Sequence, residues 1–241
     1  MCYKNNIIVL DFDNTLLLSE DKSSFILPDN FKNYELKIKS KLLSIINKNN
    51  YIIINTGRSF NSFKKLNTFP YSFLICNNGS EYYDTFDNLL KYIPLVQTDI
   101  KKFLTIKFDK NSIIKIYTPK NILNAITGIS ITINNIKILK KTFKILINLF
   151  DFSTVFFKYP KIRIVNTTTD KEKALEDLIN IRNIKATNIF AIGDDDNDYE
   201  LLKKYTSYTF PWNTEKIKSL ELPTYNNLLE ILKNIEYNYE K

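Results

Sequence analysis

Two groups of carboxylates stand at the ends of apolar runs, where a metal-assisted reaction could take place. Asp11 and Asp13 follow the run at residues 6–10. The second group follows the run at residues 188–192 and comprises Asp194, Asp195, Asp196 and Asp198. An Asp-x-Asp pair alone is weak, because acidic pairs also occur in ordinary loops and helix caps. Four neighbouring carboxylates repel one another unless a cation is bound or most of them face solvent.

Both apolar runs are typical of buried parallel strands, whose carboxyl ends meet at one edge of a sheet. A divalent cation between the two acidic groups therefore explains their charge density better than a simple acidic turn does. Its ligands would all be oxygen atoms, with neither His nor Cys nearby, and this donor set favours Mg²⁺ over zinc.

Residues that could hold a phosphate group follow two other predicted elements. Thr56 and the backbone of Gly57 come after a further apolar run and offer neutral hydrogen-bond donors. Lys171 offers a point charge. Thr169 with Glu172 three positions later predicts a capping box, which would set Lys171 in the first turn of a helix, facing a bound anion. Taken alone, Lys171 could equally be a solvated lysine at a helix start.

The composition removes several other chemistries. The chain has no histidine, so serine-histidine triads, histidine zinc sites and phosphohistidine intermediates are excluded. A cysteine-based phosphatase loop also fails, because Tyr82 stands where an arginine would be needed six positions after Cys76. Any covalent chemistry must therefore use a carboxylate or a lysine as the nucleophile.

Four motifs in order resemble those of the haloacid dehalogenase-like phosphatase superfamily. They are residues 11–15 (DFDNT), residues 56–58 (TGR), Lys171 and residues 193–198 (GDDDND). The chain most resembles the Cof-type sugar-phosphatase branch, which carries an α/β cap of the C2 type, since the insert lies between the second and third motifs. Asn14 stands where that branch usually has Gly, and Asn tolerates the left-handed conformation that such a turn needs.

The resemblance implies a role for each matching residue. Asp11 would be the nucleophile, and Asp13 would protonate the leaving alcohol and then activate water. Lys171 would act with them and hold the phosphate, together with Thr56, Gly57 and Asn197. Mg²⁺ would be bound by Asp11, by the backbone carbonyl of Asp13 and by Asp194, with Asp198 and Arg58 in supporting positions.

The order of predicted elements indicates an α/β fold, with a doubly wound parallel-sheet core of the Rossmann-like kind and an inserted α+β cap. Predicted strands at 6–10, 51–55 and 71–76 alternate with helices at 35–47 and 61–66, and a strand at 207–210 and a helix from 226 complete the core. We expect the core at residues 1–83 and 167–241. The cap, expected at 84–166, would contain strands at 113–117, 129–133, 153–158 and 162–165 and a helix at 138–150, and would set substrate specificity.

Length and composition indicate a globular protein of 241 residues with 44% hydrophobic residues. The apolar run near the N-terminus is too short for a signal peptide, and the two cysteines give no disulfide framework, so we expect a cytoplasmic enzyme with no membrane partner. The net charge of +8 is scattered and fits a compositional bias or attraction of an anionic substrate. No nucleic-acid-binding signature is present.

These features predict a Mg²⁺-dependent phosphomonoesterase that acts on a small phosphorylated metabolite, such as a sugar phosphate, as a monomer or homodimer. A sugar-phosphate phosphomutase would use the same Asp11 and is the first alternative. The second is a catalytically idle binding module, against which the full set of converging charges argues.

Overall fold

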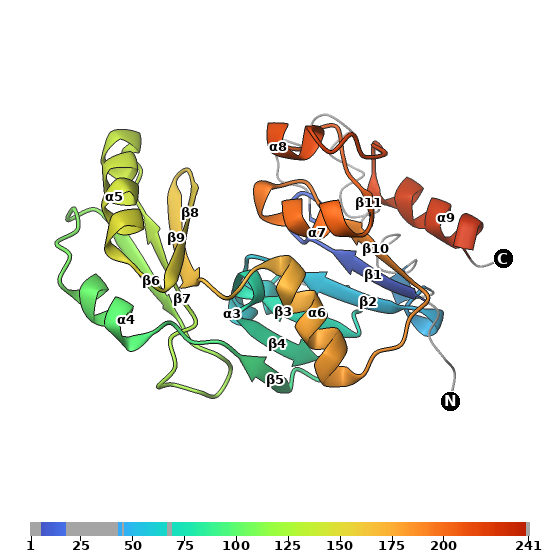
Figure 1. The fold of residues 1–241 in the computed structure, drawn as a ribbon, viewed down its shortest axis with the longest axis horizontal. Coiled ribbons are helices and arrows are strands. Elements are labelled where there is room, and N and C mark those ends of the chain that lie inside the picture. The colour runs from blue at the N-terminus through green and yellow to red at the C-terminus, as the bar shows by residue number, and fades with distance from the viewer. Residues whose placement is uncertain (1–5, 18–42, 45, 67–68, 240–241) are drawn as a thin grey trace.

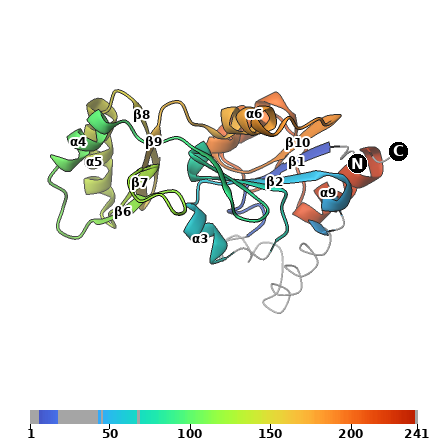
Figure 2. The ribbon, with the colours of Figure 1, turned by 90° about the horizontal axis from the view of Figure 1, so that it is seen from below.

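The computed structural model describes residues 6–17, 43–44, 46–66 and 69–239. These residues form two units, each built on its own β-sheet (Figure 1). A view turned by 90° shows the two units side by side along the long axis (Figure 2).

The larger unit, called the core below, contains a seven-stranded sheet in the order β11-β10-β1-β2-β3-β4-β5. The strands from β11 to β3 in this order are parallel, and β4 and β5 form an antiparallel hairpin at one edge. The bounds are β1 Asn6–Leu10, β2 Tyr51–Asn55, β3 Phe73–Cys76, β4 Glu81–Asp84, β5 Leu89–Tyr92, β10 Asn188–Ile192 and β11 Thr206–Tyr208. The doubly wound parallel arrangement predicted from the sequence is confirmed for the five parallel strands.

The apolar run of β1 is continuous because both faces of the core sheet are covered. Alternate side chains of a strand point to opposite faces, so Ile8 and Leu10 pack into one apolar cluster and Ile7 and Val9 into the other. The first cluster includes residues of α3 (Phe60–Lys64) and α9 (Leu228–Tyr239), and the second includes residues of α6 (Lys171–Arg182), α7 (Tyr199–Lys204) and α8 (Glu215–Lys218).

The smaller unit, called the cap below, contains an antiparallel sheet in the order β6-β7-β9-β8. Its strands are β6 Ile113–Tyr117, β7 Gly128–Thr132, β8 Ser153–Lys158 and β9 Lys161–Asn166, and its helices are α4 Gln97–Leu104 and α5 Ile136–Leu149. Both helices lie on the side of the sheet away from the core (Figure 1). Ile129, Ile131, Ile162 and Ile164 form the apolar cluster of this unit with residues of α4 and α5.

Several sequence-based expectations differ from the structure in detail. The expected insert at 84–166 includes β5 at 89–92, which pairs within the core sheet. We therefore propose that the cap begins after Tyr92. Helix α4 was not predicted, and neither was the hairpin of β4 and β5. Most of the helix expected at 35–47 lies outside the described residues, although residues 43–44 and 46–49 are helical.

Candidate active site

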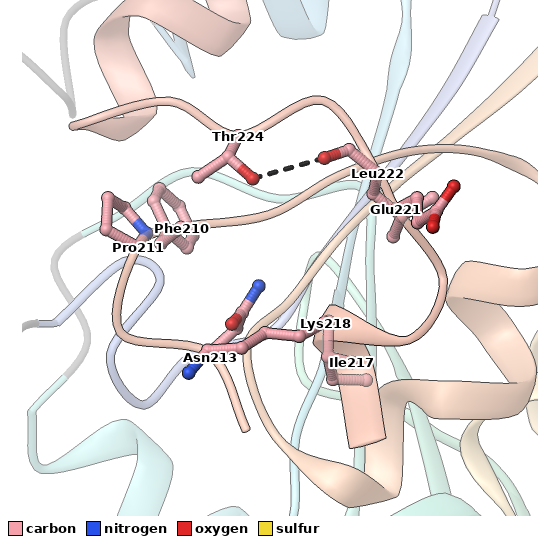
Figure 3. A pocket seen from close by; sticks show the side chains of 8 residues that line it. All are labelled: Phe210, Pro211, Asn213, Ile217, Lys218, Glu221, Leu222 and Thr224. Carbon is pink, nitrogen blue, oxygen red and sulfur yellow. Dashed lines mark hydrogen bonds between the residues drawn. The ribbon is translucent and has the colours of Figure 1, made fainter. Parts of the chain in front are cut away.

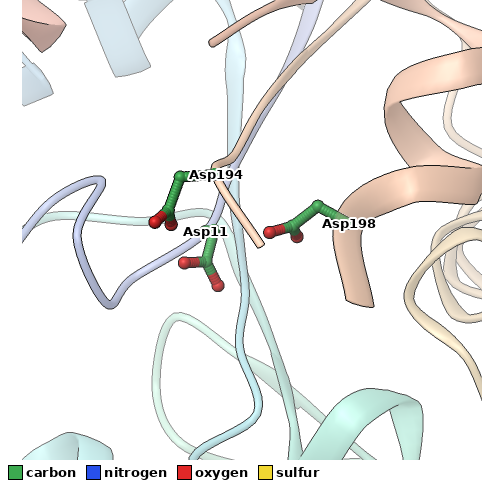
Figure 4. A group of neighbouring side chains, drawn as sticks. All are labelled: Asp11, Asp194 and Asp198. Atoms are coloured by element: carbon green, nitrogen blue, oxygen red, sulfur yellow. The ribbon is translucent and has the colours of Figure 1, made fainter. Parts of the chain in front are cut away.

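The carboxyl ends of the parallel strands bring the predicted site residues together. Asp11 directly follows β1, Thr56 directly follows β2, and Asp194 comes two residues after β10. The carboxylates of Asp11, Asp194 and Asp198 point toward a common space (Figure 4), and one oxygen from each lies within 4.8 Å of the others. Residues 183 positions apart in the sequence thus share one buried site.

Lys171 is the cation of this cluster. Its side chain is 1% exposed, and its Nζ donates to Asp11 Oδ1 at 2.5 Å and to Asp198 Oδ1 at 2.6 Å. Lys171 is the first residue of α6, and its own carbonyl accepts a hydrogen bond from Asn55 Nδ2 at 2.8 Å. Hydrogen bonds therefore fix Lys171 both at its backbone carbonyl and at its side-chain ammonium group.

The predicted capping box at the start of α6 is wrong by one residue. Asp170 is the N-cap, and its carboxylate accepts from the backbone N–H of Lys173 at 2.7 Å. Thr169 instead donates its hydroxyl to the carbonyl of Asn166. The carboxylate of Asp170 reaches the third backbone N–H of the helix as well as the expected threonine could, and Lys171 still lies in the first turn.

Three carboxylates around one ammonium group leave the cluster negative. Burial raises the pKa of Asp11; Lys171 opposes this shift and the neighbouring Asp198 adds to it. Burial likewise raises the pKa of Asp198, against the effect of Lys171. For Lys171, burial favours the neutral amine, but the two adjacent carboxylates outweigh this effect and raise its pKa. Lys171 therefore stays protonated, while its single positive charge does not balance the carboxylates around it.

A divalent cation fits this donor set. Asp11, Asp194 and Asp198 offer only carboxylate oxygens, which are the ligands that Mg²⁺ prefers, and the cluster carries excess negative charge. Asp13 does not contribute its carboxylate to the group of three found among the described residues. Its role as a ligand through the backbone carbonyl stays a prediction.

Asp13 faces a different partner from Asp11. Arg58 holds its carboxylate with two nitrogens, Nε at 2.9 Å from Oδ2 and Nη2 at 2.5 Å from Oδ1. The Asp13 side chain is 45% exposed, whereas that of Asp11 is 7% exposed. The two aspartates therefore lie in distinct environments, one closed and one accessible from outside.

The turn that follows the two aspartates has the predicted left-handed residue. Asn14 has a φ of 63°, in the left-handed region, which Asn tolerates better than most residues. Its backbone N–H donates to the carbonyl of Leu17 at 2.7 Å, and its carbonyl accepts from Trp212 Nε1 at 3.1 Å. Asn14 thus preserves the turn in the place where Gly was the expected residue.

Two glycines allow close packing around the carboxylates. A Cβ atom on Gly193 would lie 2.6 Å from Cγ of Asp198, so only glycine lets this side chain turn into the site. A Cβ on Gly57 would lie 2.9 Å from Oδ1 of Asn78 and 3.3 Å from Nη1 of Arg163. Gly193 and Gly57 thus let the backbone lie directly against the side chains of Asp198 and Asn78, respectively.

The structure also adds residues that were given no role in the predicted site. Asn78, in the short 3₁₀ helix Asn77–Gly79, accepts a hydrogen bond through Oδ1 from Asn197 Nδ2 at 3.2 Å. The signal was present, since Asn78 follows a parallel strand at the same edge of the sheet. Lys158 of the cap forms an ion pair with Asp195, and Arg163 of the cap approaches Gly57. Nothing in the sequence spacing could have placed these two cap residues here.

Two further observations concern a pocket outside the site and the lengths of the helices. A pocket of about 220 Å³ lies among residues 210–224 (Figure 3), and none of the three clustered aspartates lines it. In the part of the chain that the structure describes, no helix is both long and apolar enough to cross a membrane.

The core sheet and the buried acidic cluster define an α/β protein with a candidate metal-assisted active site, and the comparisons with known proteins identify its family. A family model described as haloacid dehalogenase-like hydrolase matches residues 8–127 and 110–210. The chain therefore belongs to the haloacid dehalogenase-like hydrolases, and both the resemblance and the enzyme class expected from the sequence are confirmed. No curated protein matches the chain.

Solved structures share the fold over almost the whole chain. A HAD/Cof-like hydrolase from Plasmodium vivax has a TM-score of 0.72 at 17% identity, covering 97% of this chain and 96% of its own. A phosphatase of the same superfamily from Bacteroides thetaiotaomicron has a TM-score of 0.72 at 16% identity, covering 97% and 94%. A subclass IIB sugar phosphatase has a TM-score of 0.69 at 14% identity, covering 97% and 98%. At these identities the likeness establishes the fold.

Proposed function

We propose that the chain is a Mg²⁺-dependent phosphomonoesterase that hydrolyses a small phosphorylated metabolite through an aspartyl-phosphate on Asp11. The observation that carries the proposal is the buried cluster in which Lys171 and two further carboxylates surround Asp11 at a strand end. Two of the similar structures are phosphatases by name, and one of these is a sugar phosphatase, which supports the substrate class.

In the first step, an oxygen of Asp11 attacks phosphorus and the bond to the ester oxygen breaks. The departing oxygen takes a proton from Asp13, whose side chain is 45% exposed and therefore accessible from outside the buried cluster. Lys171 lies beside Asp11 and stabilises the charge on the transferred phosphoryl group. Thr56, Gly57 and Asn197 would hold the phosphoryl oxygens at the same edge of the sheet.

In the second step, Asp13 removes a proton from water, and the resulting hydroxide attacks phosphorus. The bond to Asp11 breaks, which releases inorganic phosphate and restores both carboxyl groups. A bound divalent cation would supply the positive charge that keeps Asp11 ionised and neutralises the phosphoryl oxygens. The proposed ligands are Asp11 and Asp194, with the backbone carbonyl of Asp13 and support from Asp198.

The proposal includes a cytoplasmic location and a monomeric or homodimeric state. The test is a set of phosphorylated metabolites assayed for release of inorganic phosphate with and without Mg²⁺. Metal-dependent release from wild-type protein, absent in Asp11→Asn, would support the proposal. Isomerised sugar phosphate without release would replace it by a phosphomutase, and neither product from any compound would leave a binding module.

A further inference from the structure

The cap sheet has one face that carries only cations among its charged residues. Alternation along the antiparallel strands directs Ile162 and Ile164 into the apolar cluster with the helices. Lys161 and Arg163 of β9 therefore lie on the opposite face. The strand register pairs Lys161 with Lys158, Arg163 with Ser130, and Ser130 with Lys115, so these belong to the same face. We call Lys115, Lys158, Lys161 and Arg163 the basic face.

The basic face is directed at the core, because α4 and α5 cover the other side of the sheet (Figure 1). Two contacts place it beside the proposed site. Lys158 forms an ion pair with Asp195, which is the neighbour of Asp194. Arg163 Nη1 comes within 3.3 Å of the position that a Cβ on Gly57 would occupy. The face thus lies next to the loops that hold the transferred phosphate in the proposed reaction.

Three of the four cations of this face have no carboxylate partner among the described residues. Asp11 and Asp198 are held by Lys171, Asp13 by Arg58, and Asp195 by Lys158. Within the described residues, Lys115, Lys161 and Arg163 form no ion pair with a carboxylate. Balancing the core carboxylates therefore does not account for these three residues.

The unpaired cations also repel one another. Partial desolvation of Lys161 lowers its pKa, and the positive charges of Arg163, Arg58 and Lys115 lower it further, against a smaller opposing effect of Asp13. Arg163 lies over the ring of Tyr117 with 6.0 Å from Cζ to the ring centroid, which fixes the guanidinium near the sheet. Like charges held together beside a reaction site are stabilised when an anion binds between them.

We propose that the substrate carries a second anionic group, a phosphate or a carboxylate, on the alcohol side of the ester, and that Lys161 and Arg163, with Lys115, bind this group. The inference rests on the proposed function, because it assumes that the first phosphate occupies the site around Asp11. It makes Lys161 and Arg163 the residues that decide substrate choice.

The test compares kcat/KM for two matched pairs of compounds. Hexose 1,6-bisphosphate against hexose 6-phosphate tests a second phosphate, and 3-phosphoglycerate against glycerol 3-phosphate tests a carboxylate. In at least one pair, wild-type protein should prefer the doubly anionic member by about tenfold or more, as expected for a charged hydrogen bond. Whichever pair shows the preference identifies the second anion.

Variants then assign the preference to the basic face. Lys161→Gln and Arg163→Gln should each reduce the preference about tenfold, because the loss of kcat/KM falls on the doubly anionic member of the pair and not on its matched partner. Lys140→Gln removes the same charge from α5, behind the sheet, and should leave the preference unchanged. Equal kcat/KM within both pairs would overturn the inference, as would an equal loss for both members in the variants.

A binding measurement tests this inference separately from the proposed function. In Asp11→Asn protein, calorimetry needs no turnover, and the doubly anionic compound should still bind about tenfold more tightly than its matched partner. Adding Lys161→Gln should remove that difference. If wild-type protein releases no phosphate from any compound while this binding difference is present, the hydrolysis proposal fails and the inference stands. If both compounds bind equally, the inference fails whatever the activity.

Discussion

The core and the cap present charge to the same space in opposite ways. In the core, Lys171 is buried and contacts two buried carboxylates, so its charge is enclosed and its position is fixed. In the cap, Lys115 and Lys161 are exposed on a sheet face, without a carboxylate partner among the described residues. Enclosed charges keep one geometry and suit a chemical step. Exposed charges without a partner can bind an anionic ligand and suit substrate recognition.

The largest expected effect comes from replacing Asp11, the proposed nucleophile in the buried site of the core. Asp11→Asn should lower kcat below about 1% of wild type, because the amide is nearly isosteric yet cannot attack phosphorus. The circular dichroism spectrum should not change. Steady-state phosphate release on the best substrate is the measurement, and a rate of more than a few per cent of wild type would remove Asp11 from its assigned role.

Removing the enclosed cation should damage the fold itself. Lys171→Met leaves Asp11 and Asp198 buried without their ammonium partner, and breaking a buried pair in this way costs about 3–5 kcal/mol. Urea unfolding of the metal-free protein at neutral pH measures the loss. Lys204→Met is the matched control, because Lys204 pairs with Glu172 and Glu176 at the surface, where such contacts contribute little. Similar losses of unfolding free energy in the two variants would contradict the expected difference between the buried and the surface ion pairs.

Mg²⁺ should supply the positive charge that the enclosed cluster lacks. At about a hundredfold excess over Kd, binding to the native state contributes about 2.7 kcal/mol, which raises the Tm of a protein of this size by about 5–10 °C. Asp194→Asn should abolish the shift. A full shift in that variant would place the metal elsewhere.

The effect of Mg²⁺ should also depend on pH in a defined direction. Burial raises the folded-state pKa values of Asp11 and Asp198 above the ordinary 3.8. Between 3.8 and those raised values the native state binds more protons than the unfolded state, so the metal-free protein loses stability as pH rises through this window. Mg²⁺ competes with the same protons. Its Tm shift should therefore be larger at about pH 8 than at about pH 5, and the reverse order would contradict the assignment.

The smallest expected effect lies where the two units join. Thr127 donates its hydroxyl to buried Glu81 of β4 at 2.5 Å, and Tyr83 donates to the other carboxylate oxygen at 2.8 Å. Thr127→Val leaves one carboxylate oxygen without its donor and should cost about 1–3 kcal/mol, while kcat for 4-nitrophenyl phosphate stays near wild type. Thr127→Ser retains the hydroxyl and should recover most of the stability. Equal losses in both would show that the methyl group, not the hydrogen bond, matters.

The enclosed site was largely predictable from the sequence, and the open face was not. Asp11, Thr56 and Asp194 each follow a continuous apolar run, and parallel strands bring their carboxyl ends to one edge whatever lies between them. Arg163 reaches Gly57 only through strand register, and a shift of one residue would turn it to the other face. Strand β5 fell within the expected insert because a half-exposed edge strand lacks a continuous apolar run. Asp170 displaced Thr169 as the helix cap because both residue types can accept the same hydrogen bond.

The position of β1 in the middle of the core sheet has a consequence for synthesis of the chain. One edge of β1 pairs with β2, but the other pairs with β10, and Asn6 meets Asn188 across 182 positions. At a synthesis rate of about 5–20 residues per second, that second edge waits about 10–40 s for its partner. During this time its unpaired backbone can template association with other chains. Nascent chains that stop before residue 188 should therefore depend on chaperones to stay unaggregated, and Asp11 can join its site only after Asp194 and Asp198 have been translated.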